Sequence, residues 1–177
     1  MKRIVAVVLS MLMVMVMTAA FAAEKEIVFT DPLTGASVYL EMEGEHYLEF
    51  LENPEEDMCI FEVSRDGFPT VTVTVYAKDT TDKNMNDWTD EEMAQCIAFY
   101  QSEESEGTLI TEEVTPAGNK YIRFLNESEE GSVEERYTVF EDFDMSRIMF
   151  KEGGTFTEEE TAFLAEVQSS LWVMKAE

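Results

Sequence analysis

The chain has 177 residues, with 12 lysines and arginines against 38 aspartates and glutamates, and its formal net charge is −26. Such a negative potential repels phosphate backbones and anionic membrane surfaces, so it argues against binding to nucleic acid or to lipid headgroups. A chain of this length can bury one good hydrophobic core. No repeat or low-complexity linker divides the sequence, so we expect a single folded domain.

The N-terminal 22 residues have the three parts of a secretory signal peptide. Lys2 and Arg3 form a basic start, and a long apolar run then ends in Ala20 and Ala22, at the spacing of a cleavage site before Ala23. The alternative is an uncleaved membrane anchor, because the run is near the minimum length of a membrane span. No cysteine stands at the end of the run, so the lipid-attachment signal of bacterial lipoproteins is missing. The pattern predicts a secreted bacterial protein.

Cleavage after residue 22 leaves a mature domain over residues 23–177. This domain keeps all 38 acidic residues but only 10 of the 12 basic ones, so its formal charge is −28. Solubility in an extracellular medium explains such acidity. A cationic partner or bound divalent ions is the alternative explanation. In either case we expect no contact with the membrane once the signal peptide is removed.

Alternating apolar residues and turn signals predict strands in the first half of the mature chain. Two pairs are expected, 26–30 with 36–42 across DPLTG, and 58–64 with 70–77 across RDGFP. The segment GEHYLEFLENPEED stays open between a short helix and an extended piece. Valines alternate with threonines in the strand over 70–77, and an uncharged strand at a sheet edge would invite aggregation. We therefore place that strand inside the sheet.

The second half of the chain predicts a helix over 89–101, four strands in a row and a final helix. The four strands are expected over 108–115, 120–126, 133–141 and 145–151. Their short connections favour antiparallel pairing. The final helix is expected from residue 158 to about 174, because apolar residues recur there at helical spacing: Phe163, Leu164, Val167, Leu171 and Met174. Together the elements predict an α+β domain, with an antiparallel sheet of about six to seven strands and two amphipathic helices packed on it.

This order of elements resembles the Mog1/PsbP-like fold. The resemblance begins with the strand that opens as TDPLTGASVYLEM, continues through a hairpin, a helix and a four-strand meander, and ends in a helix with VQSSLW. It spans nearly the whole mature chain. The family includes photosystem subunits, nuclear-transport factors and small secreted bacterial proteins, so the resemblance implies binding and scaffolding, mostly without catalysis. It carries over no functional residues, because the chain has no family motif on which to place them.

The stretch DKNMNDWTDEEM poses the question of a calcium site. Asp82, Asn84 and Asn86 stand at positions 1, 3 and 5 of a possible EF-hand loop. Such a loop also needs glycine at position 6 and a bidentate glutamate at position 12. The chain has Asp87 and Met93 there, so the two positions on which the geometry most depends are missing.

A helix cap explains the same stretch better. Thr89 and Glu92 form the T-x-x-E pattern of a capping box, and Trp88 and Met93 occupy the two positions of a hydrophobic staple. We therefore expect a helix start here, with neither a metal site nor a cofactor. A divalent-cation-binding protein remains an alternative.

Catalytic constellations are not apparent in the sequence. His46 is the only histidine and stands among glutamates, and no nucleophile follows the G-x-S-x-G pattern. Gly153-Gly154 lacks the Lys-Ser/Thr of a phosphate loop. Among 38 acids, some pair will have glycosidase spacing by chance. We expect a non-catalytic module that binds an extracellular protein or a cell-envelope ligand, and a hydrolase using paired carboxylates is the alternative.

The two cysteines, Cys59 and Cys96, leave two possibilities open. An even number of cysteines in an exported protein favours a disulfide. Cys59 shares a strand face with Phe61 and Val63, and Cys96 lies on the apolar stripe of the first helix, so both are expected in the core. If the two helices cover opposite faces of the sheet, the thiols need not meet. Both would then remain free as small apolar side chains.

The signal-peptide prediction has a direct test. Expression in a bacterial host that exports the chain, followed by mass spectrometry of the medium, should give a mature protein that begins within a residue or two of Ala23. Recovery of Met1 or of the intact apolar run in the secreted material would contradict the prediction.

Overall fold

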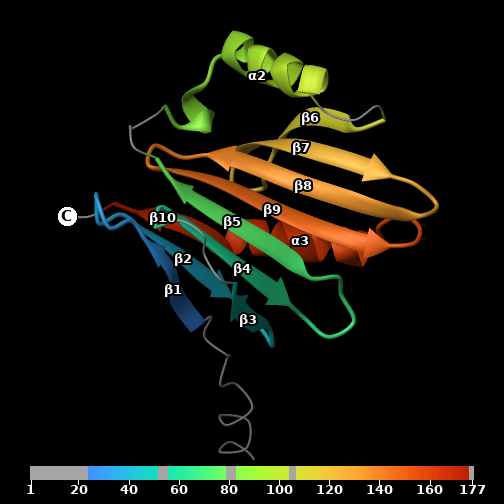
Figure 1. Cartoon of the computed structure of the whole chain (residues 1–177), viewed down its shortest axis with the longest axis horizontal. Coiled ribbons are helices and arrows are strands. Elements are labelled where there is room, and N and C mark those ends of the chain that lie inside the picture. The colour runs from blue at the N-terminus through green and yellow to red at the C-terminus, as the bar shows by residue number, and fades with distance from the viewer. Residues whose placement is uncertain (1–23, 52–55, 79–82, 104–106, 176–177) are drawn as a thin grey trace, which may run out of the picture.

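The structure is a computed structural model that describes residues 24–51, 56–78, 83–103 and 107–175. Figure 1 shows how its strands and helices are arranged. The predicted signal peptide, with Ala20, Ala22 and Ala23, lies outside these residues. Within them, no helix combines the length and the apolar character that a membrane span requires.

The larger of two antiparallel sheets has seven strands in the order β3-β4-β5-β9-β8-β7-β6. Their bounds are β3 (Tyr47–Phe50), β4 (Met58–Ser64), β5 (Val71–Ala77), β6 (Leu109–Val114), β7 (Lys120–Glu127), β8 (Gly131–Val139) and β9 (Phe143–Glu152). The α+β prediction is confirmed. The uncharged strand β5 lies inside the sheet between β4 and β9, as expected, and β6 to β9 form the predicted meander. β3 shows that part of the ambiguous segment is extended.

The smaller sheet contains the first two expected strands and one strand that was not expected. It consists of β1 (Glu24–Thr30), β2 (Ser37–Met42) and β10 (Leu171–Met174), in the order β1-β2-β10. The expected strands over 26–30 and 36–42 therefore lie in a sheet of their own, apart from the seven-stranded sheet. The final helix, α3 (Glu158–Ser170), also ends earlier than expected, and the chain continues directly into β10.

Pairing with β2 explains why the chain leaves the helix after residue 170. Leu171 lies opposite Leu40 in the small sheet, and Trp172 stacks on Tyr39 with ring centroids 4.6 Å apart. An aromatic residue and a β-branched residue favour this pleated surface over another helical turn. Leu171 is buried, as the helical stripe had suggested, but it is buried as a strand residue.

The small sheet and α3 pack on the same face of the large sheet (Figure 1). One hydrophobic core fills the space between these layers, and it includes Val38, Leu40, Phe61, Val73, Met145, Leu164 and Val167. All of these side chains are at most 1% exposed. The core therefore depends on both ends of the chain, since β1 and β2 come first and α3 and β10 come last.

The opposite face of the large sheet is covered at one end only. There the short helix η1 (Met85–Asp87) and helix α2 (Asp90–Glu103) pack over β6 and β7. A second, smaller core lies beneath them and includes Met85, Met93, Ile110, Ile122 and Phe124. In Figure 1, α2 lies beside β6, and α3 is seen behind β5 and β9.

The predicted cap of α2 is confirmed. The backbone N–H of Thr89 donates to Glu92 Oε2 at 2.6 Å, and the backbone N–H of Glu92 donates to Thr89 Oγ1 at 3.2 Å. Trp88 packs against the same cluster as Met93, as a hydrophobic staple requires. The polar stretch before α2 thus starts a helix.

No disulfide joins Cys59 and Cys96. Cys59 lies in the main core, where its Sγ is 3.4 Å from the Val28 carbonyl oxygen. Cys96 lies on α2, which packs on the other face of the sheet, and it is only partly buried. The expectation that both cysteines lie in the core is therefore met by Cys59 and only in part by Cys96, which packs against the smaller core. Burial, with the nearby charge of Asp144, raises the pKa of the Cys96 thiol and keeps it protonated.

The core predicts a contrast between two residues near the C-terminus. Leu164→Ala removes a fully buried side chain of α3 and should lower the free energy of unfolding by roughly 2–5 kcal/mol. Met174→Ala changes a residue that is 45% exposed and should stay within about 0.5 kcal/mol of the wild type. Urea denaturation followed by circular dichroism measures both. Equal losses in the two variants would mean that α3 does not hold the layers together.

Candidate functional site

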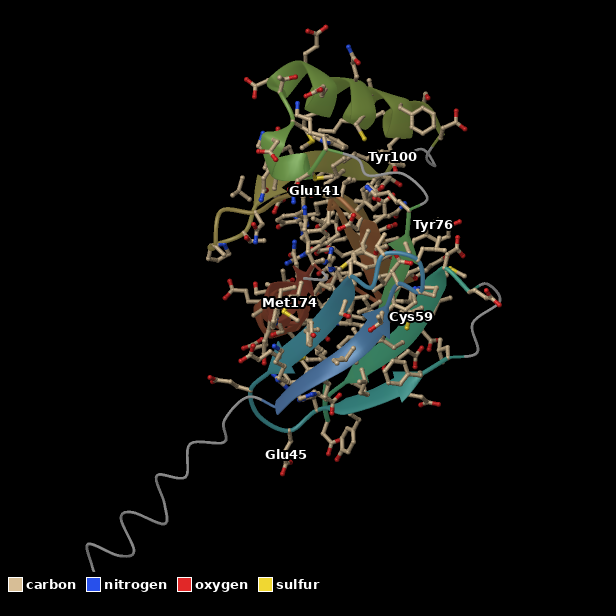
Figure 2. The ribbon with its side chains drawn as sticks, turned by 90° about the vertical axis from the view of Figure 1, so that its left-hand side faces the viewer. Glu45, Cys59, Tyr76, Tyr100, Glu141 and Met174 are labelled. Atoms are coloured by element: carbon tan, nitrogen blue, oxygen red, sulfur yellow. The ribbon has the colours of Figure 1, made fainter. Side chains whose placement is uncertain are left out.

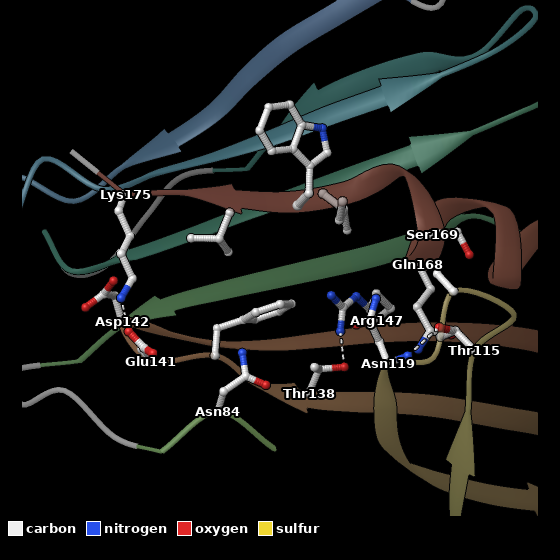
Figure 3. A pocket seen from close by; sticks show the side chains of 15 residues that line it. Asn84, Thr115, Asn119, Thr138, Glu141, Asp142, Arg147, Gln168, Ser169 and Lys175 are labelled. Atoms are coloured by element: carbon white, nitrogen blue, oxygen red, sulfur yellow. Dashed lines mark hydrogen bonds and ion pairs between the residues drawn. The ribbon is translucent and has the colours of Figure 1, made fainter. Parts of the chain in front are cut away.

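A pocket of about 350 Å³ lies where loops and strand ends of both sheets meet (Figure 3). One wall is β10. The other walls are the β6–β7 turn, the β8–β9 turn, the last turn of α3 and the loop around Asn84. Its volume is at the small end of the range for ligand-binding pockets. Because five separate segments meet here, the pocket exists only in the folded chain.

Arg147 lies in the middle of this pocket in the view of Figure 3. It belongs to the central strand β9, where it takes an inward position between Met145 and Met149 in the alternation of the strand. Its side chain is only 1% exposed, and it is among the largest fully buried side chains of the protein. An arginine is almost never buried in this way unless it is paired with an acid.

The hydrogen bonds of Arg147 do not neutralise its charge. Nη1 donates to Thr138 Oγ1 at 2.9 Å and to the Met145 carbonyl oxygen at 3.3 Å, and Nη2 lies 3.2 Å from Met145 Sδ. Nε is buried without any hydrogen-bond partner. Within the described ranges, no carboxylate forms an ion pair with this guanidinium. Arg147 is therefore a buried cation with a donor to spare.

The pKa of Arg147 also reflects its burial without an acidic partner in the described residues. Burial, together with the nearby positive charge of Arg136, lowers this pKa to about 9. The group still carries its charge at neutral pH. A bound anion would stabilise that charged form, since an opposite charge within a few ångströms offsets the cost of burial.

The neighbouring arginine Arg136 has the opposite arrangement. Its Nε donates to Glu134 Oε1 at 2.7 Å, and Nη1 donates to Gln168 on α3 at 3.1 Å. Arg123 Nη2 holds the other carboxylate oxygen of Glu134 at 2.8 Å. Burial raises the pKa of Glu134, but the hydrogen bond from Arg123 and the charge of Arg136 outweigh it, so the pKa is lowered. The charge of this buried acid is thus shared by Arg123 and Arg136 and does not compensate Arg147.

Charged and amide groups surround the rest of the pocket. At one end in Figure 3, Lys175 pairs with Glu141 of the β8–β9 turn, next to Asp142. At the other end, Asn119 lies beside Thr115 of the β6–β7 turn. The pocket therefore offers a cation at its centre, amides at one end, and both signs of charge at the other.

The residues considered for a calcium loop help to build one wall of the pocket. Asp82 lies outside the described residues. Asn84 caps η1, and its side chain accepts a hydrogen bond from the backbone N–H of Asn86 at 2.9 Å. The Asn86 amide joins this loop to the β6–β7 turn, with Nδ2 3.0 Å from Asn119 Oδ1 and Oδ1 2.7 Å from the Lys120 backbone nitrogen. The side-chain oxygen of Asn84 and both polar side-chain atoms of Asn86 thus form hydrogen bonds within the protein.

The part of the chain that the structure describes contains no cluster of metal-binding side chains. No group of three or more histidine, cysteine, aspartate or glutamate side chains there could hold a metal ion. His46 lies in the loop before β3, where its Nδ1 is 3.1 Å from the Gly44 carbonyl oxygen. Gly153 and Gly154 form the turn after β9, both with positive φ.

The carboxylates of the described chain give little support to a hydrolase. Such an enzyme needs one carboxylic acid with a raised pKa to protonate the leaving group. In the four carboxyl groups whose pKa departs clearly from its ordinary value, the pKa is lowered. Burial raises it in Asp31 and Glu134, but hydrogen bonds from neighbouring donors outweigh that effect. In Glu92 and Glu160 the hydrogen bond from a lysine is the main cause.

Comparison with known proteins supplies no identity for this site. No protein family and no curated protein matches the chain. The site must therefore be interpreted from its own residues. Sequence reasoning did not find Arg147, although the alternation of FDMSRIMF places this single charge on the apolar face of a strand. That signal becomes visible only when the strand is known to be central, with both neighbours paired.

Substitution of Arg147 and substitution of Arg136 should have different effects on the free energy of unfolding. Arg147→Met removes an unpaired buried charge, so the free energy of unfolding should stay the same or rise, by up to about 2 kcal/mol. Arg136→Met breaks a buried ion pair and should lower it by about 3 kcal/mol. Urea denaturation at neutral pH, without added organic acids, measures both values. A loss of more than about 2 kcal/mol in Arg147→Met would mean that this arginine serves the fold.

Proposed function

We propose that the protein is a secreted, non-catalytic binding module that captures a small carboxylate group in the pocket around Arg147. The observation that carries the proposal is the buried guanidinium without an acidic partner in the described chain, with Nε lacking any acceptor. Proteins rarely keep a buried charge uncompensated, because its desolvation costs several kcal/mol. A bound carboxylate would supply both the missing negative charge and the missing acceptor.

A singly charged anion fits the surroundings better than a phosphate. The mature chain has a formal charge of −28, so it repels an approaching dianion more strongly than a carboxylate. Within the pocket, Lys175 is already paired with Glu141, which leaves Arg147 as the cation available to the ligand. Asn119 and Gln168 add amide groups that suit the polar parts of an organic acid.

The wider context agrees with binding rather than chemistry. The predicted signal peptide before Ala23 gives the module an extracellular location. The resemblance to the Mog1/PsbP-like fold implies binding and scaffolding, mostly without catalysis. In the pocket, no thiol or histidine stands beside Arg147 to act as a nucleophile or general base among the residues that line it.

Titration with propionate tests the proposal. Nuclear magnetic resonance of the ¹⁵N-labelled protein should show saturable shifts of the Arg147 Nε–H signal, with Kd on the order of millimolar for so small a ligand. In Arg147→Met, the Kd measured from the signals around the pocket should rise at least about tenfold, because a charge-assisted hydrogen bond is lost.

A matched control lies on the same strand. Lys151→Met removes one positive charge from β9, but Lys151 pairs with Glu160 and does not line the pocket. This variant should bind propionate as the wild type does. Equal weakening in both variants would point to a general effect of net charge, and the absence of saturable shifts in the wild type would rule the proposal out.

A further inference from the structure

The wall of the pocket opposite Arg147 is an open strand edge. In the described residues, β10 pairs with β2 on one side only, because the order of the small sheet is β1-β2-β10. Its other edge has no strand beside it. An edge strand of this kind directs backbone N–H and C=O groups away from its partner and can accept a further strand.

The residues that line the pocket show that the open edge of β10 faces it. Leu171, Trp172 and Val173 all line the pocket, although successive side chains of a strand point to opposite faces. Both faces are already used: Leu171 and Val173 pack on the main core, and Trp172 stacks on Tyr39. Three consecutive residues can line one pocket in this arrangement only if their backbone edge faces it. Figure 3 shows the ribbon of β10 running past Arg147 along the pocket.

The pocket combines an open backbone edge with a buried guanidinium, and the C-terminal end of an extended peptide has a complementary group for each of them. An extended peptide can pair with a strand edge through its main chain, and its terminal carboxylate can then bind an arginine. Free organic acids use only the second of these features. Resting on the proposed carboxylate site, we infer that its ligand is the C-terminal end of an extended polypeptide, which adds to the open edge of β10 and places its free carboxylate at Arg147.

The size of the site and the charge of the protein indicate the length and the charge of the peptide ligand. β10 has four residues, and at about 3.3 Å per residue it offers an edge for three or four residues of a partner strand. The pocket volume of about 350 Å³ also suits a few residues rather than a folded surface. Because the protein is strongly acidic and Asp142 lines the pocket, a peptide end that carries lysine or arginine is preferred over an acidic one.

Acetylated tetrapeptide mixtures provide the test. One mixture, randomised at all four positions without cysteine, ends in a free carboxylate, and a second mixture ends in an amide. Both are passed over immobilised wild-type protein, and retained peptides are identified by mass spectrometry. Retained sequences are resynthesised and titrated by calorimetry as the acid, as the amide and with single backbone N-methyl groups.

The inference expects three results. The acid form binds at least about tenfold more tightly than propionate and than its own amide. At least one N-methyl group weakens binding by a similar factor, because it removes a backbone donor that pairs with β10. Arg147→Met abolishes the preference for acid over amide, while Lys151→Met retains it.

Other outcomes separate this inference from the proposed function. If propionate binds through Arg147 but no retained peptide binds more tightly, the carboxylate site stands and the peptide inference is overturned. Tight binding that is insensitive to every N-methyl group would also overturn it, since the β10 edge would then take no part. If neither propionate nor any peptide binds, both proposals fail.

Discussion

The burial of one face of the seven-stranded sheet is the constraint on which the rest of the structure depends. On β4, β5 and most of β9, this face is apolar and lies under the small sheet and α3. From β8 onward the same face becomes charged, with Glu134 and Arg136 at inward positions. Buried charges must be paired, and Glu134, Arg136 and Gln168 meet that demand by joining β8 to α3. Arg147 stands at the border between the two regions, where the apolar core offers it no acid.

Much of the fold could be predicted from the sequence, because its signals are local. Alternation identified the strands of the meander, the uncharged β5 was recognised as an interior strand, and the Thr89–Glu92 pattern located the start of α2. Figure 2 shows the resulting arrangement, with Tyr100 near the end of the molecule that α2 occupies and Cys59 farther down, beside the strands of the small sheet. Each of these features depends on residues within a few positions of one another, which is the distance over which sequence patterns are informative.

The features that sequence reasoning missed depend on pairing between distant residues. Helical spacing assigned Leu171 and Met174 to α3, and only the partner strand β2 makes β10 preferable there. The separation of Cys59 from Cys96 follows from which sheet face each helix covers, which spacing does not specify. Arg147 could not be distinguished from an ordinary surface arginine before β9 was known to be central. The candidate site therefore came almost wholly from the tertiary structure.

The small sheet joins the two ends of the domain, and this has a consequence for how the chain is made. Leu40 pairs with Leu171, a separation of 131 residues, so closing this sheet requires nearly the entire domain. Contacts between residues so far apart in sequence slow folding, because the loop between them must be ordered first. A chain that emerges from the ribosome N-terminus first cannot complete its main core until its last helix and strand are available. Such late closure would suit the export that the N-terminal sequence predicts, because a chain without a completed core can still pass through a translocation channel that accepts unfolded polypeptides.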